Sequence, residues 1–170
     1  MTASPGNAYS LNMSHPQKKA YWLMKSEPDV FSIDDLKKSK TTLWDGVRNY
    51  QARNYMTREM RDGDLVLFYH SNAVPSGVAG LAVVVGPAQV DPSQFDRKSP
   101  YFDAKATPEK PIWFCVQIKY KKKFKRFISL TELRKNPTFG GMRLLEKGSR
   151  LSIQPVAQEH FLALCEMGEN

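Results

Sequence analysis

The most informative stretch of the chain is Trp44-Asp45-Gly46-Val47-Arg48-Asn49-Tyr50-Gln51-Ala52-Arg53-Asn54. It places a tryptophan, a tyrosine, two arginines and three side-chain amides around a glycine turn. Recognition of an unstacked base uses these residue types, because flat rings stack on the base, amides read its hydrogen-bonding edge and arginines hold the flanking phosphates. The composition alone also allows Trp44 and Tyr50 to be ordinary core residues and Asn49 to be a turn former.

The segments on either side of this stretch predict a strand and two helices. Residues 21–24 are apolar or aromatic and predict a strand. Ser32 and Asp35 have the spacing of a capping box, which predicts that a short helix begins there. Residues 51–60 predict a second helix, and the polar turn at 61–64 ends it.

The rest of the chain is dominated by short strands. Strands are expected at 65–70, 78–85 and 112–120, with a shorter one at 124–128. A second capping pattern at Ser129 predicts a helix that stops before Pro137. Residues 150–154 alternate between apolar and polar side chains, as in a half-buried strand, and a final helix follows Pro155. Short strands with helices inserted between them, and no βαβ rhythm, predict an α+β fold with a mixed sheet or small barrel.

A second polar cluster, Phe68-Tyr69-His70-Ser71-Asn72, lies where a predicted strand runs into a loop. Residues at strand ends often line sites, because the scaffold holds them in place while the loop stays open. His70 is a candidate base, ligand or hydrogen-bond donor to a substrate oxygen. It is equally compatible with a structural capping role.

A cluster of basic residues is the plainest charge signal. Six cations fall within eight residues without an acid: Lys119, Lys121, Lys122, Lys123, Lys125 and Arg126. Such a run either faces phosphates or forms a solvated hairpin whose lysines keep an edge strand from aggregating.

Length and composition predict one intracellular domain with a polyanionic partner. The chain has 170 residues, of which 41% are hydrophobic, and a formal charge of +8. This size suits one core, and the charge favours nucleic acid first and an anionic membrane surface second. Residues 1–19 are rich in Pro, Gly, Asn and Ser and predict a disordered tail. The sequence lacks an apolar run long enough to span a bilayer and lacks a signal peptide, which predicts an intracellular protein, cytoplasmic or nuclear.

Signals for catalysis are weak. The chain contains no nucleophile elbow, Walker loop or zinc-binding motif. Cys115 and Cys165 lie in apolar segments without metal-clip spacing, so neither a zinc site nor a disulfide framework is predicted. The Cys115 thiol is expected to stay protonated and inert. No cofactor and no metal are expected.

Four motifs in register give the chain a family resemblance from about residue 21 to its end. They are Trp22-Leu23-Met24-Lys25-Ser26-Glu27-Pro28, the stretch 44–54, Gly63-Asp64 through Asn72, and Arg150-Leu151-Ser152-Ile153-Gln154-Pro155-Val156. Together they resemble the EVE domain family. The resemblance implies one EVE domain over residues 20–170 and a PUA-like mixed β-barrel with helices inserted between its strands. It also implies kinship with the YTH readers of methylated adenine and the SRA readers of methylated cytosine.

The resemblance further implies a non-catalytic reader of a flipped, methylated or hydroxymethylated base in DNA or RNA, with no membrane partner and with protein partners unknown. Carried over by position, the pocket residues would be Trp22, Lys25, Ser26, Trp44, Asn49, Tyr50, His70, Ser71, Ser152 and Gln154. The phosphate-binding residues would be Arg48, Arg53, Lys121, Lys122, Lys123, Lys125 and Arg126. Two alternatives stay open: a general RNA-binding PUA-like module, and an enzyme acting on a modified nucleotide through Glu27, Asp45 or His70.

Overall fold

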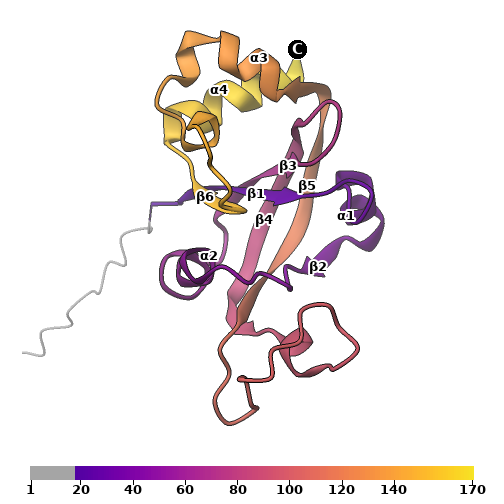
Figure 1. The fold of residues 1–170 in the computed structure, drawn as a ribbon. Helices are drawn as coiled ribbons and strands as arrows, with labels where there is room; N and C mark the ends of the chain where they lie inside the picture. Colours follow the sequence, from indigo (N-terminus) through magenta and orange to yellow (C-terminus); the bar gives the residue numbers. More distant parts are fainter. Residues whose placement is uncertain (1–17) are drawn as a thin grey trace, which may run out of the picture.

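The protein, described by a computed structural model over residues 18–170, is built around one mixed six-stranded sheet (Figure 1). The strands are β1 (Tyr21–Ser26), β2 (Thr41–Leu43), β3 (Leu65–His70), β4 (Gly77–Val90), β5 (Phe114–Ser129) and β6 (Ile153–Pro155). The α-helices are α1 (Ile33–Ser39), α2 (Tyr50–Asn54), α3 (Leu130–Lys135) and α4 (Gln158–Glu169). A π-helical turn (Tyr55–Glu59) continues α2, and short 3₁₀ turns occur at Pro92–Phe95, Pro137–Phe139 and Arg143–Leu145.

The sheet has the order β2-β5-β4-β3-β1-β6, with β2 and β6 at its ends. β1 and β3 run parallel, and every other neighbouring pair is antiparallel. The predicted α+β class and mixed sheet are therefore confirmed. The two end strands do not pair with each other within residues 18–170, so the sheet is open and the predicted closed barrel is not confirmed.

Some predicted strand boundaries are wrong. The strands expected at 112–120 and 124–128 are a single strand, β5, and the basic cluster lies inside it instead of in a hairpin. The run 119–126 contains no Gly, Pro, Asn or Asp to form a turn. The pairing of β5 with β4 shifts register at several points, but β5 continues without a turn. The strand expected at 150–154 is also shorter than predicted, because only Ile153–Pro155 pairs with β1.

Other local predictions are confirmed. α1 begins at a capping box in which the Ser32 hydroxyl accepts from the Asp35 amide and the Asp35 carboxylate accepts from the Ser32 amide. Ser129 caps α3, which ends before Pro137. The predicted tail, residues 1–19, lies outside the described residues except for its last two. No helix within the described part of the chain has the length and apolar character needed to cross a membrane.

The sheet separates two apolar clusters. In β1, Trp22 and Met24 point into one cluster and Leu23 into the other, because neighbouring side chains of a strand face opposite sides. The first cluster includes residues of α1 and α2, and the second includes residues of α3 and α4. Figure 1 shows α3 and α4 together at one end of the molecule, with the segment between β4 and β5 forming the other end.

Candidate nucleic-acid interface

A cleft of about 930 Å³ opens beside the ends of β1 and β3. β1 and β3 are parallel neighbours with Ser26 opposite His70, so both strands end at the same edge. β6 runs antiparallel to β1, which brings the loop before it to that edge, and the Lys25 amide donates to the Ser152 carbonyl at 2.9 Å. The cleft is lined by residues that include Lys25, Ser26, Trp44, Asp45, Arg48, Ser71, Tyr101, Arg150 and Ser152.

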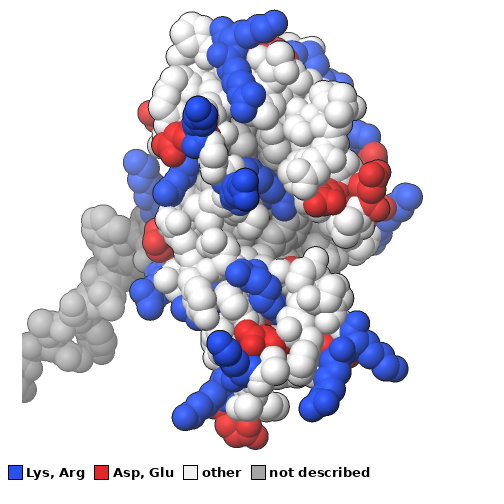
Figure 2. Space-filling model, in the orientation of Figure 1, with Lys and Arg blue, Asp and Glu red and all other residues white. Residues whose placement is uncertain are grey.

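The cleft carries charge of both signs, with more cations than acids. Lys25, Arg48 and Arg150 line it, against Glu27 and Asp45. Figure 2 shows the hollow near the middle of the face drawn, with Lys and Arg side chains on both sides. Burial lowers the pKa of Lys25 below its ordinary value. Burial and then repulsion from Asp91 raise the pKa of Asp45. Both shifts reflect a partly desolvated cleft, where an anion between the cations would interact strongly.

Trp44 forms part of the cleft wall and part of the core. Its ring is 6% exposed and meets the ring of Phe68 edge-on at 5.6 Å between centroids. The backbone amide of Trp44 donates to Val116 of β5 at 2.8 Å, which holds the segment against the sheet. Trp44 is therefore a core residue, as the composition allowed, and it also lines the cleft.

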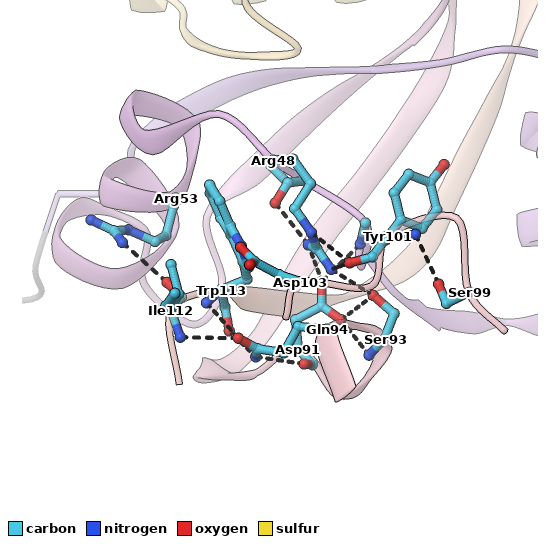
Figure 3. A network of polar contacts seen from close by, with 12 residues as sticks. Arg48, Arg53, Asp91, Ser93, Gln94, Ser99, Tyr101, Asp103, Ile112 and Trp113 are labelled. Atoms are coloured by element: carbon cyan, nitrogen blue, oxygen red, sulfur yellow. Dashed lines mark hydrogen bonds and ion pairs between the residues drawn. The ribbon is translucent and has the colours of Figure 1, made fainter. Parts of the chain in front are cut away.

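The guanidinium of Arg48 ties the 44–48 segment to the segment between β4 and β5 (Figure 3). Nε and Nη2 donate to the Tyr101 carbonyl at 2.9 and 2.6 Å, and Nη2 also donates to the Ser93 hydroxyl at 3.0 Å. Nη1 donates to the Val47 carbonyl at 3.0 Å and to Asp91 Oδ2 at 2.9 Å. An arginine has five N–H donors, and Arg48 makes five hydrogen bonds within the protein. The guanidinium that the sequence predicted to bind phosphate is therefore already engaged by the fold.

Asp91 is the buried anion of this network. Its side chain is fully buried and also accepts from the Gly46 amide at 2.8 Å, the Ser93 amide at 2.8 Å and the Ser93 hydroxyl at 2.6 Å. Burial alone raises the pKa of Asp91, but the hydrogen bonds from Ser93, Arg48 and Gly46 outweigh it and hold that pKa below its ordinary value. The carboxylate therefore holds the cleft wall in its ionised form.

Five of the ten predicted pocket residues line the cleft: Lys25, Ser26, Trp44, Ser71 and Ser152. The other five are not among the residues that line it. Trp22 is buried, and its indole Nε1 donates to Asp64 at 3.0 Å. Gln154 is also buried, and its amide donates to the Ser149 hydroxyl and the Leu151 carbonyl, which supports the loop at the cleft.

The remaining three residues have structural partners. Asn49 caps α2 by accepting from the Ala52 amide at 3.0 Å. Tyr50 is 59% exposed and packs on Trp113, with centroids 4.9 Å apart. His70 Nε2 accepts from the Ile33 amide at 3.1 Å, and burial lowers the pKa of this imidazole. The neutral ring therefore acts as an acceptor at the start of α1.

The predicted phosphate-binding residues of β5 lie away from the cleft and largely face acids. Lys123 pairs with Asp34 of α1 at 2.8 Å, and Arg126 pairs with Glu132 of α3 at 2.8 Å. Lys122 and Lys125 both lie within 4 Å of Glu169 of α4. In addition, Arg53 donates to the Ile112 carbonyl at 3.1 Å. Three carboxylates thus lie beside four of the six cations in the run 119–126.

A family model for the EVE domain matches residues 20–167. The chain belongs to the EVE domain family. It is 42% identical over 160 residues to thymocyte nuclear protein 1 of Homo sapiens, covering 84% of this chain and 71% of that protein. It is 41% identical over 180 residues to thymocyte nuclear protein 1 of Danio rerio, covering 94% and 77%. The expected family resemblance is confirmed.

Solved EVE-like structures have the same fold. A hypothetical protein from Leishmania major superposes with a TM-score of 0.85 at 47% identity, covering 91% of this chain and 97% of that chain. The human THYN1 protein, solved in complex with DNA containing 5-methylcytosine, superposes with a TM-score of 0.82 at 40% identity, covering 89% and 99%.

Three residues that matter to this EVE domain's cleft escaped the sequence analysis. Tyr101 and Asp91 lie in the segment between β4 and β5, for which no element was predicted, and Arg150 was assigned to a strand. Asp91 does carry a local signal, because an Asp before Pro92 and Ser93 is typical of an N-cap, and it caps the 3₁₀ turn there. Tyr101 has no such signal, since only the folded chain brings it to the cleft.

Metal ligands and the buried thiol were also considered in the sequence, and the structure describes both. Within residues 18–170, no group of three or more His, Cys, Asp or Glu side chains is arranged to hold a metal. Burial raises the pKa of the Cys115 thiol to about 12, so it stays protonated and unreactive at neutral pH.

Proposed function

We propose that this EVE domain is a non-catalytic reader of a modified base in nucleic acid, and that its cleft holds the base flipped out of the strand. The observation that carries the proposal is the cleft itself, which combines an aromatic wall at Trp44 with cations at Lys25 and Arg150. Its volume of about 930 Å³ lies within the roughly 300–1,000 Å³ typical of small-ligand sites. The solved complex of human THYN1 with 5-methylcytosine-containing DNA supports DNA carrying a methylated base as the ligand class.

In this proposal the base lies against Trp44, and the hydroxyls of Ser26, Ser71 and Ser152 are available to its polar edge. Lys25 and Arg150 attract the phosphates on either side of the flipped nucleotide. A buried methyl gains roughly 0.8 kcal/mol per carbon, which is a preference of about fourfold. A larger preference requires that the unmodified base leave a polar group of the cleft unpaired.

The predicted pocket residues that do not line the cleft support its walls in this proposal. Asn49 holds the start of α2, His70 holds the start of α1, and Gln154 holds the loop that carries Ser149 and Leu151. The PUA-like classification belongs to the same proposal, because a base site at the ends of strands in a mixed sheet is what that kinship implies.

A binding titration at fixed salt tests the proposal. Oligonucleotides that differ only in one cytosine or 5-methylcytosine are compared, in single- and double-stranded form and as DNA and RNA. The protein should bind the methylated DNA several-fold more tightly. Equal affinity for both bases in every format would contradict a reader and favour a general nucleic-acid-binding module.

Two lysine variants separate the cleft from the basic strand. Lys25→Gln removes a cleft cation, whereas Lys122→Gln removes a cation that pairs with Glu169 outside it. Lys25→Gln should weaken binding to all oligonucleotides and flatten the dependence of log affinity on log salt, because a phosphate contact releases counterions. Lys122→Gln should change affinity less. A larger loss of affinity for Lys122→Gln than for Lys25→Gln would indicate that the phosphates bind along β5 instead of in the cleft.

A further inference from the structure

Tyr101 is an exposed aromatic residue at the cleft. Its side chain lines the cleft, yet the residue is 43% exposed, in contrast to 6% for Trp44. The two rings therefore differ in depth, with Trp44 forming the buried wall and Tyr101 bordering solvent. The residue is more than half buried, with its ring against Gly46 and near the Arg48 guanidinium, and the rest of its surface is open to solvent at the cleft.

The backbone of Tyr101 is held firmly. Its carbonyl accepts two hydrogen bonds from Arg48, and its amide donates to the Ser99 hydroxyl at 3.1 Å. Arg48 is anchored by the buried carboxylate of Asp91. The Arg48 guanidinium carbon also lies 5.6 Å from the centroid of the Tyr101 ring, and Figure 3 shows the Tyr101 hydroxyl at the end of the ring far from this network.

The ring itself rests on Gly46. A Cβ added at Gly46 would lie 2.7 Å from Tyr101 Cε2, and the backbone there has φ of +75°, which favours glycine. The Asp91 carboxylate accepts from the Gly46 amide and from Arg48. It therefore holds the turn under the Tyr101 ring and also the arginine that binds the Tyr101 backbone carbonyl. The Tyr101 ring is therefore held in one position at the cleft, so it loses little side-chain entropy when a ligand binds to it.

Flipping a base out of a strand leaves the neighbouring base unstacked on one face, and an aromatic side chain can replace the lost stacking. We propose that Tyr101 stacks on the nucleotide next to the flipped base, and so contributes affinity for the flanking chain without reading the modification. This inference rests on the proposed function. It assigns Trp44 to the flipped base because of its depth, and Tyr101 to the neighbour because of its exposure.

The test compares Tyr101→Ala with the parent protein on two methylated oligonucleotides: one intact, and one with abasic sites on both sides of the modified base. On the intact strand the variant should lose about 5- to 150-fold in affinity, the range for stacking on one base. On the strand with abasic neighbours the loss should be less than about twofold, because no neighbouring base remains to stack. The affinity ratio of methylated to unmethylated DNA should not change.

Three further variants control the test. Phe102→Ala removes an aromatic residue that is 37% exposed, one position along the chain and outside the cleft lining, and should leave binding within about twofold. Tyr101→Phe should keep the parent affinity, since it retains the ring. Tyr101→Leu keeps apolar packing on Gly46 but lacks a flat ring, and should bind as weakly as the alanine variant.

Two results would overturn the inference while leaving the reader function intact: an unchanged affinity of the alanine and leucine variants for the intact strand, or an equal loss on the intact and abasic strands. The second result would place Tyr101 against the flipped base or in the fold. A parent protein that does not distinguish methylated from unmethylated DNA would instead refute the proposed function, and the inference with it.

Discussion

Replacing Asp91 with asparagine should weaken the whole wall of the cleft, although the two side chains have nearly the same shape. The Asp91 carboxylate is fully buried and accepts from the Gly46 amide, Arg48 Nη1, the Ser93 amide and the Ser93 hydroxyl. An asparagine has one oxygen and one NH₂ group, so either the Gly46 and Arg48 donors or the Ser93 donors would face another donor.

The magnitude follows from the burial of the pair. Removing one member of a buried ion pair costs about 3–5 kcal/mol, because the other charge is left uncompensated. The Arg48 side chain is 22% exposed and keeps its bonds to two backbone carbonyls, so we expect a loss of about 3 kcal/mol. For a domain of this size that loss lowers the thermal midpoint by about 6–12 °C.

Urea denaturation followed by tryptophan fluorescence measures the effect. The midpoint should fall while the slope stays constant, because the surface exposed on unfolding does not change. Asp34→Asn is the matched control: its ion pair with Lys123 is about half exposed on both sides and should contribute less than about 1 kcal/mol. A loss for Asp91→Asn no larger than that of the control would refute the view that this carboxylate holds the cleft together.

Three further predictions concern predicted pocket residues. The free energy of unfolding should fall as the pH is lowered from about 7 to 5. Burial lowers the pKa of His70 in the folded state, where its neutral Nε2 accepts from the Ile33 amide, so the unfolded chain takes up the proton first. Chemical denaturation of His70→Gln should show a smaller fall. Asn49→Ala should lose about 1 kcal/mol of stability in the same assay, since it removes the cap of α2, and should leave the preference for the methylated base unchanged; a smaller preference would place its amide on the base. Trp44→Ala should cost about 3–5 kcal/mol of stability, because its buried ring packs on Phe68. A variant as stable as the parent protein would contradict the place of Trp44 in the core.

Local signals in the sequence were sufficient for most elements and for the family. The capping box at Ser32 and the N-cap at Ser129 depend on atoms three residues apart, and α1 and α3 begin where those patterns predict. The motifs contained all ten predicted pocket residues, of which five line the cleft, and Lys25, Ser26 and Ser71 lie at the ends of strands that the sequence identifies.

Only the tertiary structure decided which charged residues line the cleft and which pair with acids elsewhere. Lys123 pairs with Asp34, 89 positions away, and Lys122, Lys125 and Arg126 of the same basic run also lie beside acids that are distant in the sequence or beyond the strand. Arg48 and Tyr101 are 53 positions apart, and no periodicity links them, yet they are hydrogen-bonded and both line the cleft. Strand and cap patterns arise from atoms a few residues apart, whereas charge pairing and cleft shape depend on which distant segments the sheet order brings together.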